Sequence, residues 1–158
     1  MSEGIHYRKA ALADLRPIAV MEKAYFGRHA FGAGMLLYLL LHAGEGFIVA
    51  ESGTEVVGYL VVRRESVRRA RAELPTFAVR EDQRGRGIGS ALLTRGLDHL
   101  ARIGVRRVTL QVSVRNPRAR KLYERFGFKV ERTLPGYYGA GDDALLMIRM
   151  LAKEAEAG

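Results

Sequence analysis

Arg84-Gly85-Arg86-Gly87-Ile88-Gly89-Ser90 is the stretch of this 158-residue chain that most narrows its fold and chemistry. A short apolar run ending at Val79 precedes the stretch, and apolar residues at helical spacing follow it as far as Ile103. The stretch is therefore predicted to be a loop that joins a strand to a helix. Alternate glycines let the backbone approach a ligand closely, and the start of the helix offers unpaired N–H groups. Because two arginines add further donors, the pattern predicts a site for a phosphate-bearing ligand.

Two common nucleotide-binding loops do not fit this stretch. A dinucleotide fingerprint needs a third glycine where Ser90 stands, and an acidic residue closing the next predicted strand, which reads Val108-Thr109-Leu110-Gln111-Val112. A Walker loop needs a lysine after its last glycine, and no lysine follows these glycines. The loop is therefore not expected to bind nicotinamide or flavin dinucleotides, or to hydrolyse nucleoside triphosphates.

The whole chain alternates between strand and helix patterns without a repeat or a linker, which predicts a single domain over residues 1–158. Helices are expected over residues 12–26, 33–43, 87–103 and 116–126. Strands are expected over residues 5–9, 46–50, 55–64, 73–79, 107–114, 128–134 and 143–151. This order predicts an α/β (α+β) fold in which helices cover a mixed sheet. Pro75, inside a predicted strand, hints that the sheet opens beside the glycine loop.

Composition limits the classes of partner and of chemistry. The formal charge of +9 favours an acidic partner, whether a polyphosphate cofactor, an acidic substrate or nucleic acid. The chain has no cysteine, so a disulfide framework and catalysis through sulfur are excluded, and its four histidines lack metal-ligand spacing, so no metal is expected. The longest apolar run, Met35 to Leu41, is too short to cross a bilayer, and the first residues do not resemble a signal peptide. We therefore expect a cytoplasmic protein with no membrane partner.

Three motifs, in order along the chain, carry a resemblance to a known family. They are Phe77-Ala78-Val79, the loop pattern Arg84-x-x-Gly87-x-Gly89, and Asn116-Pro117-x-Ala119-x-x-Leu122-Tyr123-x-x-x-Gly127-Phe128. On these residues the chain resembles the GNAT superfamily of acetyl-CoA-dependent N-acetyltransferases. The resemblance implies the GNAT fold, with a mixed, mostly antiparallel central sheet of about seven strands, splayed at the cofactor site and flanked by about four helices.

The resemblance also implies how acetyl-CoA is held and cleaved. The backbone of Phe77, Ala78 and Val79 would pair with the pantetheine arm, and the Val79 N–H would stabilise the oxyanion. Asn116, the only asparagine, would touch the same arm, although it also fits an ordinary helix N-cap. Tyr123 would protonate the departing thiolate, although it also fits a core position. The pyrophosphate would be bound by the loop, from Arg84, Gly85, Arg86, Gly87, Ile88, Gly89 and Ser90.

Within this superfamily, the run from Tyr137-Tyr138 to Met147 looks like that of protein Nα-acetyltransferases, which include the ribosomal-protein alanine type and archaeal relatives. In those enzymes the paired tyrosines line the slot for the first residues of the peptide, although here they also fit a hairpin loop. The segment Glu22-Lys23-Ala24-Tyr25-Phe26 similarly matches the end of their first helix, where an aromatic residue contacts the substrate. The resemblance therefore implies that the substrate-binding residues are Glu22, Tyr25, Phe26, Tyr137 and Tyr138.

The general base is where the resemblance fails, because Gln111 stands where those enzymes carry a glutamate. An amide can orient a water or the amine but cannot accept a proton, so Glu73, Asp142 or water could take that role. An α-amino group titrates near ~7.7–8 and a lysine near ~10.4, so an α-amino acceptor needs less help. The favoured reaction is direct acetyl transfer to a protein N-terminus, with ribosomal proteins among the candidates.

Three questions stay open at this stage. Gln111 keeps a small-molecule amine as an alternative acceptor. The arginines of residues 63–71 are read either as a solvated loop or as an anionic docking patch, and only a dominant patch would favour a non-catalytic CoA-binding or RNA-binding module. No nucleic acid partner is otherwise favoured, and both a monomer and a dimer fit the sequence.

Overall fold

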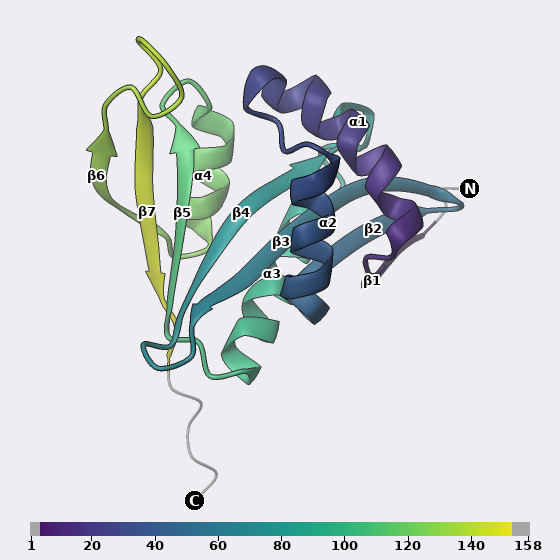
Figure 1. The fold of residues 1–158 in the computed structure, drawn as a ribbon, viewed down its shortest axis with the longest axis horizontal. Helices are drawn as coiled ribbons and strands as arrows, with labels where there is room; N and C mark the ends of the chain where they lie inside the picture. Colours follow the sequence, from purple (N-terminus) through teal and green to yellow (C-terminus); the bar gives the residue numbers. More distant parts are fainter. Residues whose placement is uncertain (1–3, 153–158) are drawn as a thin grey trace, which may run out of the picture. The chain divides into compact units, whose positions relative to one another are not determined.

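A computed structural model describes residues 4–152 and confirms the predicted order of elements. The helices of this part of the chain are α1 (Leu15–Phe26), α2 (Ala33–Ala43), α3 (Ile88–Arg102) and α4 (Pro117–Arg125). Its strands are β1 (Ile5–Lys9), β2 (Phe47–Ser52), β3 (Glu55–Ser66), β4 (Arg71–Val79), β5 (Arg107–Ser113), β6 (Lys129–Leu134) and β7 (Ala144–Met150). Figure 1 shows these elements in the colours of the sequence.

Most element boundaries differ from the expectation by one or two residues, and two of the differences have a clear local reason. The helix expected over residues 12–26 begins with a 3-10 turn, Leu12–Asp14, because the buried Asp14 carboxylate accepts bonds from the Ala11 N–H and the Arg8 guanidinium. β2 begins at Phe47 because Gly46 lies in another 3-10 turn. A Cβ on Gly46 would sit 2.2 Å from the Val62 carbonyl oxygen, so only glycine allows this close approach.

The strands form one mixed sheet in the order β1-β2-β3-β4-β5-β7-β6. Antiparallel pairs join β1 to β2, β2 to β3, β5 to β7 and β6 to β7, so the predicted mostly antiparallel sheet is confirmed. β4 and β5 pair in parallel, with Arg71–Glu73 opposite Arg107–Thr109. A parallel pair needs a crossover connection, and α3 supplies it. The splaying of the sheet near Pro75 stays a prediction.

The chain forms two compact units. The first contains the residues up to Arg63 together with Thr76–His99, and the second contains Arg64–Pro75 together with the residues from Leu100 onward. β3, β4 and α3 each contribute residues to both units, because each crosses one of these boundaries. A single functional domain over the whole chain stays a prediction.

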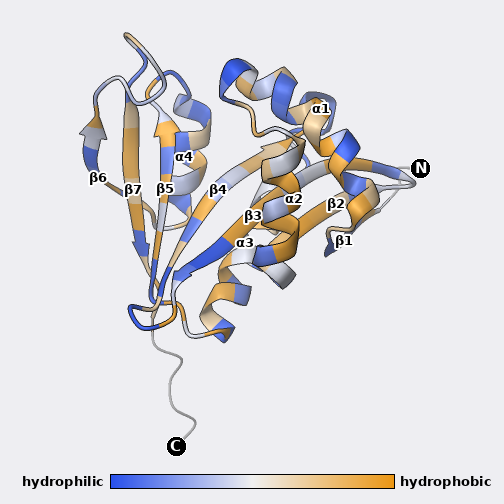
Figure 2. Ribbon diagram, in the orientation of Figure 1, coloured by the Kyte–Doolittle hydropathy of each residue, from blue (hydrophilic) through white to orange (hydrophobic). Residues whose placement is uncertain are grey.

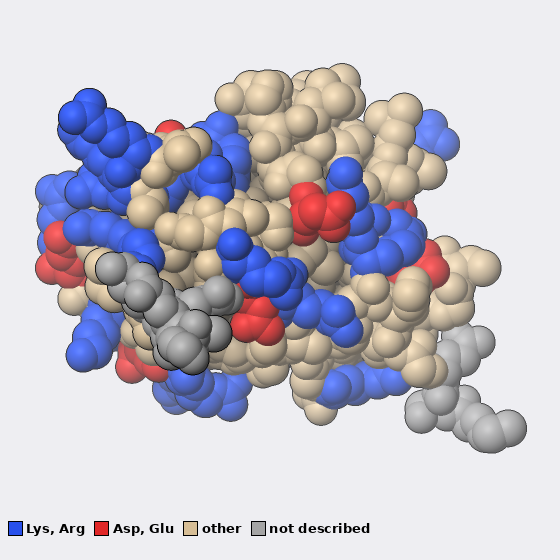
Figure 3. Space-filling model, turned by 90° about the horizontal axis from the view of Figure 1, so that it is seen from below, with Lys and Arg blue, Asp and Glu red and all other residues tan. Residues whose placement is uncertain are grey.

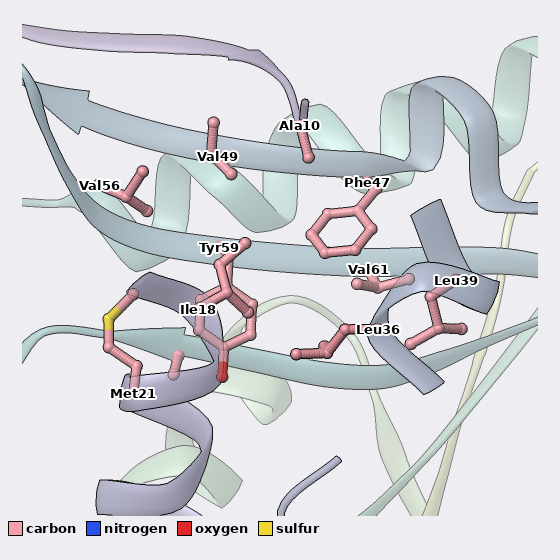
Figure 4. Close-up of a cluster of buried hydrophobic side chains, with 11 residues drawn as sticks. Ala10, Ile18, Met21, Leu36, Leu39, Phe47, Val49, Val56, Tyr59 and Val61 are labelled. Carbon is pink, nitrogen blue, oxygen red and sulfur yellow. The ribbon is translucent and has the colours of Figure 1, made fainter. Parts of the chain in front are cut away.

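β3 is the centre of the first unit, because helices cover both of its faces. Figure 1 shows α1 and α2 on the near side of β2 and β3, and Figure 2 shows the apolar colouring of these strands. Tyr59 and Val61 pack toward α1 and α2, in the cluster drawn in Figure 4. Gly58 and Leu60 face α3, where Leu92 and Gly96 lie against them. This burial on both faces explains why β3 is apolar along most of its length.

The second unit is built on β5 and β7. β5 alternates buried and half-buried residues, with Val108, Leu110 and Val112 pointing to the core. Almost every residue of β6, at the edge of the sheet, is exposed. Tyr123 of α4 packs edge-on against Phe128, with ring centroids 5.8 Å apart, and both side chains are buried. The core of this unit therefore contains a residue predicted to be catalytic.

No helix in the described part of the chain is both long enough and apolar enough to span a bilayer. Figure 3 shows Lys and Arg side chains scattered over the face seen from below. Two of the arginines in the 63–71 cluster bond within the protein, since Arg63 donates to the Tyr38 hydroxyl (3.0 Å) and Arg64 to the Ile103 carbonyl. Arg68 and Arg69 are exposed at the turn between β3 and β4.

Candidate functional site

The glycine loop of the first unit adopts a backbone that ordinary residues avoid. Gly85 and Gly87 have φ angles of +83° and +78°, and a Cβ at either position would meet nothing within 4 Å. Glycine is therefore required here by backbone conformation and not by crowding. Gly89 differs from these two, because it already belongs to the first turn of α3.

The start of α3 presents backbone donors beside these glycines. The first bond of the helical ladder runs from the Ala91 N–H to the Gly87 carbonyl, at 3.0 Å. The N–H groups of Ile88, Gly89 and Ser90 therefore precede that ladder, at the positive end of the helix dipole. Loop and helix start together have a geometry that suits an anion, and phosphate binding at this loop stays a prediction.

The end of β4, which leads to the glycine loop, is buried and hydrogen-bonded in the first unit. Ala78 and Val79 are buried. The Arg80 N–H donates to the Val57 carbonyl at 2.7 Å, and the Arg84 Nε–H donates to the Val79 carbonyl at 3.0 Å. Both sides of the Val79–Arg80 peptide are thus fixed, so the position of Val79 is well defined.

Tyr25, predicted to contact substrate, lies against the glycine loop. Its hydroxyl accepts a hydrogen bond from the Glu81 N–H at 2.8 Å. Its ring lies under the Arg84 guanidinium, 5.0 Å from the ring centroid, which is cation–π geometry. Phe26, the next residue, is partly buried against the core cluster of α1, α2 and β3.

Glu22, also predicted to bind substrate, is an internal acceptor and only 1% exposed. Its carboxylate accepts bonds from the Tyr59 hydroxyl (2.6 Å), the Thr76 hydroxyl (2.9 Å) and the Phe31 N–H (3.3 Å). Burial raises the pKa of Glu22, and these hydrogen bonds oppose the rise. Sequence reasoning missed the link to Thr76, which precedes the predicted cofactor strand Phe77-Ala78-Val79.

The second unit holds Asn116 and Tyr123 on the same short helix. Asn116 is the N-cap of α4, where its Oδ1 accepts a hydrogen bond from the Ala119 N–H at 3.1 Å. Tyr123 is buried, and burial raises the pKa of its phenol, so the hydroxyl stays protonated at neutral pH. The N-cap and core readings of these two residues are thus confirmed. Their contacts with the cofactor remain predictions.

Gln111, which stands at the position of the missing base, and the two carboxylates that could replace that base, Asp142 and Glu73, have different surroundings in this unit. Gln111 of β5 is half-buried and lies opposite Leu146 of β7. The Asp142 carboxylate accepts a hydrogen bond from the Ser113 hydroxyl at 2.6 Å. Glu73 of β4 is half-buried and lies opposite Thr109 of β5. No one of the three is singled out by its geometry.

Tyr137 and Tyr138 lie in a folded loop between β6 and β7. Their rings meet edge to face, with centroids 4.9 Å apart. Tyr137 is 53% exposed, whereas burial raises the pKa of Tyr138 to about 12. The loop is held by bonds from the Gly136 N–H to Asp143 (2.8 Å) and from the Tyr138 N–H to the Asp142 carbonyl (3.1 Å). The ring of Tyr137 is therefore presented to solvent on a hydrogen-bonded loop.

No group of three His, Asp or Glu side chains in residues 4–152 could hold a metal ion.

Comparison with known proteins identifies the family of this chain. The model of the acetyltransferase (GNAT) family matches residues 13–128. An N-alpha-acetyltransferase of Sulfurisphaera tokodaii is 39% identical over 111 residues, which cover 64% of this chain and 66% of that protein. The crystal structure of Ard1 from Thermoplasma volcanium has a TM-score of 0.86 at 27% identity, covering 94% of this chain and 98% of that one.

A chain of the NatC complex, solved with Gag peptide and CoA bound, has a TM-score of 0.85 at 25% identity, covering 94% of this chain and 99% of that one. These matches confirm the resemblance that the three sequence motifs carried, including its Nα-acetyltransferase branch. The chain therefore belongs to the GNAT family of acetyltransferases.

Proposed function

We propose that the protein is an acetyl-CoA-dependent N-acetyltransferase whose acceptor is a protein N-terminal α-amino group. The observation that carries the proposal is the left-handed backbone of Gly85 and Gly87, directly before the N-terminus of α3. That geometry suits a pyrophosphate. The CoA bound to the NatC complex supports the choice of cofactor, and the N-alpha-acetyltransferase relative supports the acceptor.

The proposed reaction is a direct transfer. The neutral amine attacks the thioester carbonyl, a C–N bond forms, and collapse of the tetrahedral intermediate breaks the C–S bond. The Val79 N–H stabilises the oxyanion, and the Tyr123 phenol gives its proton to the departing CoA thiolate. The amine loses a proton to water or to a carboxylate, Asp142 or Glu73, and a proton from water returns the Tyr123 phenolate to the phenol before the next turnover. The proposed setting is the cytoplasm, with ribosomal proteins among the candidate acceptors.

A change of Gln111 to Glu tests whether a base is missing on β5. We expect turnover of a peptide acceptor at pH 7 to rise about tenfold, since a positioned carboxylate can accept the ammonium proton. The gain should shrink toward pH 9, where an α-amino group is already neutral. Initial rates of thiol release across this pH range measure it.

Thr109→Glu is the matched control, because Thr109 is half-buried two residues away on the same strand. It adds the same charge to the same face of β5. A gain from Thr109→Glu as large as that from Gln111→Glu would mean that charge, and not position, accelerates the reaction.

Gly87→Ala tests the left-handed loop. An alanine held at φ +78° carries a strain of about 1–2 kcal/mol, so we expect CoA affinity to fall about fivefold to thirtyfold. Isothermal titration calorimetry with CoA measures the change. Gly34→Ala is the control, because Gly34 lies in α2, its φ is not positive and a Cβ there meets nothing within 4 Å. If the Gly87 variant and the wild type bound CoA with equal affinity, the loop would not be part of the CoA site.

The proposal is tested by thiol release from acetyl-CoA with three kinds of acceptor. Peptides with a free N-terminus should support turnover, whereas spermidine and aminoglycosides should not. The reverse pattern would assign the protein to small-molecule amines. No turnover with any amine would indicate a binding module.

A further inference from the structure

We infer that Tyr25 is a positioning residue for the acetyl-CoA loop and not a contact for the acceptor. This inference rests on the proposed function, because it concerns the loop and strand proposed to hold the cofactor. It changes the role that the sequence resemblance implied for Tyr25. All the contacts that carry it lie within the first unit.

Two independent contacts fasten Tyr25 to the segment that follows β4. The Glu81 N–H donates to its hydroxyl at 2.8 Å, and the Arg84 guanidinium lies 5.0 Å from the centroid of its ring. One contact holds the edge of the phenol and the other holds its face. A side chain held in both ways is poorly placed to move toward an acceptor.

Arg84 connects Tyr25 to the proposed oxyanion position. The face of its guanidinium lies on the Tyr25 ring, and its Nε–H donates to the Val79 carbonyl at 3.0 Å. That carbonyl belongs to the residue whose N–H is proposed to stabilise the oxyanion. A guanidinium has five N–H donors, so Nη1 and Nη2 keep four that these two contacts do not use. Arg84 can therefore hold Val79 and a phosphate oxygen at once.

The same helix end is fastened to β4 at a second point. Glu22, three residues before Tyr25, accepts the Thr76 hydroxyl bond at 2.9 Å. Thr76 directly precedes the Phe77-Ala78-Val79 segment, and Val79 is its last residue. The last turns of α1 therefore restrain both ends of the segment, through Glu22 at Thr76 and through Tyr25 and Arg84 at Val79. We therefore place Tyr25 in the support of the cofactor strand.

The test compares Tyr25→Phe, which keeps the ring, with Tyr25→Leu, which removes it. By calorimetry we expect the Kd for CoA to rise about threefold in the first variant and about tenfold in the second, as one and then both contacts are lost. The KM for an acceptor peptide, at saturating acetyl-CoA, should stay within about twofold of the wild type if only the cofactor side is affected.

Tyr38 offers a matched control on α2. The Arg63 guanidinium lies 5.6 Å from its ring centroid, and Arg63 donates to its hydroxyl at 3.0 Å. It thus has the same two kinds of contact, but Arg63 belongs to β3 and not to the glycine loop. Tyr38→Phe and Tyr38→Leu should bind CoA like the wild type, with Tm values recorded for all four variants.

Three results would overturn the inference. Tyr25→Leu could bind CoA as the wild type does, or lose affinity only as much as Tyr38→Leu. Tyr25→Leu could also raise the peptide KM while the CoA Kd stays unchanged, which would restore the role in acceptor binding. In each of these cases the wild type still binds CoA and acetylates peptides, so the proposed function survives. A wild type that binds no CoA would overturn both.

Discussion

Replacing Tyr123 by phenylalanine is expected to lower turnover about 10²–10³-fold while CoA affinity stays within about twofold of the wild type. The change removes only the hydroxyl, so the ring keeps its edge-on contact with Phe128. Burial raises the pKa of Tyr123, which keeps the phenol protonated and able to donate at neutral pH. Without that proton the thiolate must leave as an anion or take a proton from water. Single-turnover thiol release measures the effect on the transfer step, and CoA calorimetry on the same sample measures the effect on CoA affinity.

Phe128→Leu is the control for packing. Phe128 is 1% exposed and supports the Tyr123 ring, but it carries no ionisable group. We expect it to lower the free energy of unfolding by about 1–2 kcal/mol and to slow turnover far less than Tyr123→Phe. If Tyr123→Phe turned over at the wild-type rate, the Tyr123 phenol would not be the proton donor, and Tyr123 would be a core residue only.

Replacing Glu22 by alanine is expected to lower the free energy of unfolding by about 3 kcal/mol or more. Two buried hydroxyl groups, of Tyr59 and Thr76, would lose their acceptor, and each unsatisfied group costs about 1–3 kcal/mol. Glu22→Gln keeps the shape and one carbonyl oxygen, so its loss should be clearly smaller. Urea denaturation of the two variants measures both values. Equal stability of Glu22→Ala and the wild type would show that the carboxylate does not hold this cluster.

The pH dependence of this effect has a definite sign. Burial raises the pKa of Glu22 in the folded protein, so the folded state binds more protons than the unfolded state in the interval between the two pKa values. The free energy of unfolding contributed by Glu22 is complete below about 4.3, the ordinary pKa of glutamate, and is lost as pH rises through the folded value. The amide of the Glu22→Gln variant does not titrate, so this pH-dependent loss of stability is absent from that variant. Its stability relative to the wild type should therefore rise between pH 4 and pH 7, and parallel stability curves would contradict the assignment.

Local pattern was enough to predict the elements and the glycine loop. Every predicted helix and strand is present, because hydrophobic periodicity reflects which face each element buries. Gly85 and Gly87 adopt left-handed angles, which glycine alone adopts without strain, so the residue type allows this backbone. Asn116 at the N-cap of α4 follows from the same kind of local rule.

The roles of Glu22 and Tyr25 could not be predicted in the same way. Their partners are distant in sequence, with Tyr59 at 37 residues and Thr76 at 54 from Glu22, and Glu81 at 56 from Tyr25. A local pattern cannot show which strand a helix end will meet. One signal was present, since Glu22 follows Ile18 by four residues and so lies on the buried face of α1. A carboxylate at such a position needs internal donors.

The most direct test of the account is to find where the acetyl group is attached on a lysine-containing peptide. The protein would be incubated with acetyl-CoA and the same peptide with a free or a blocked N-terminus, and the products mapped by tandem mass spectrometry. We expect acetylation of the α-amino group alone, with one CoA thiol released for each acetyl transferred and no product from the blocked peptide. Acetylation of the lysine in the blocked peptide, or no acetylation of the free one, would contradict this expectation.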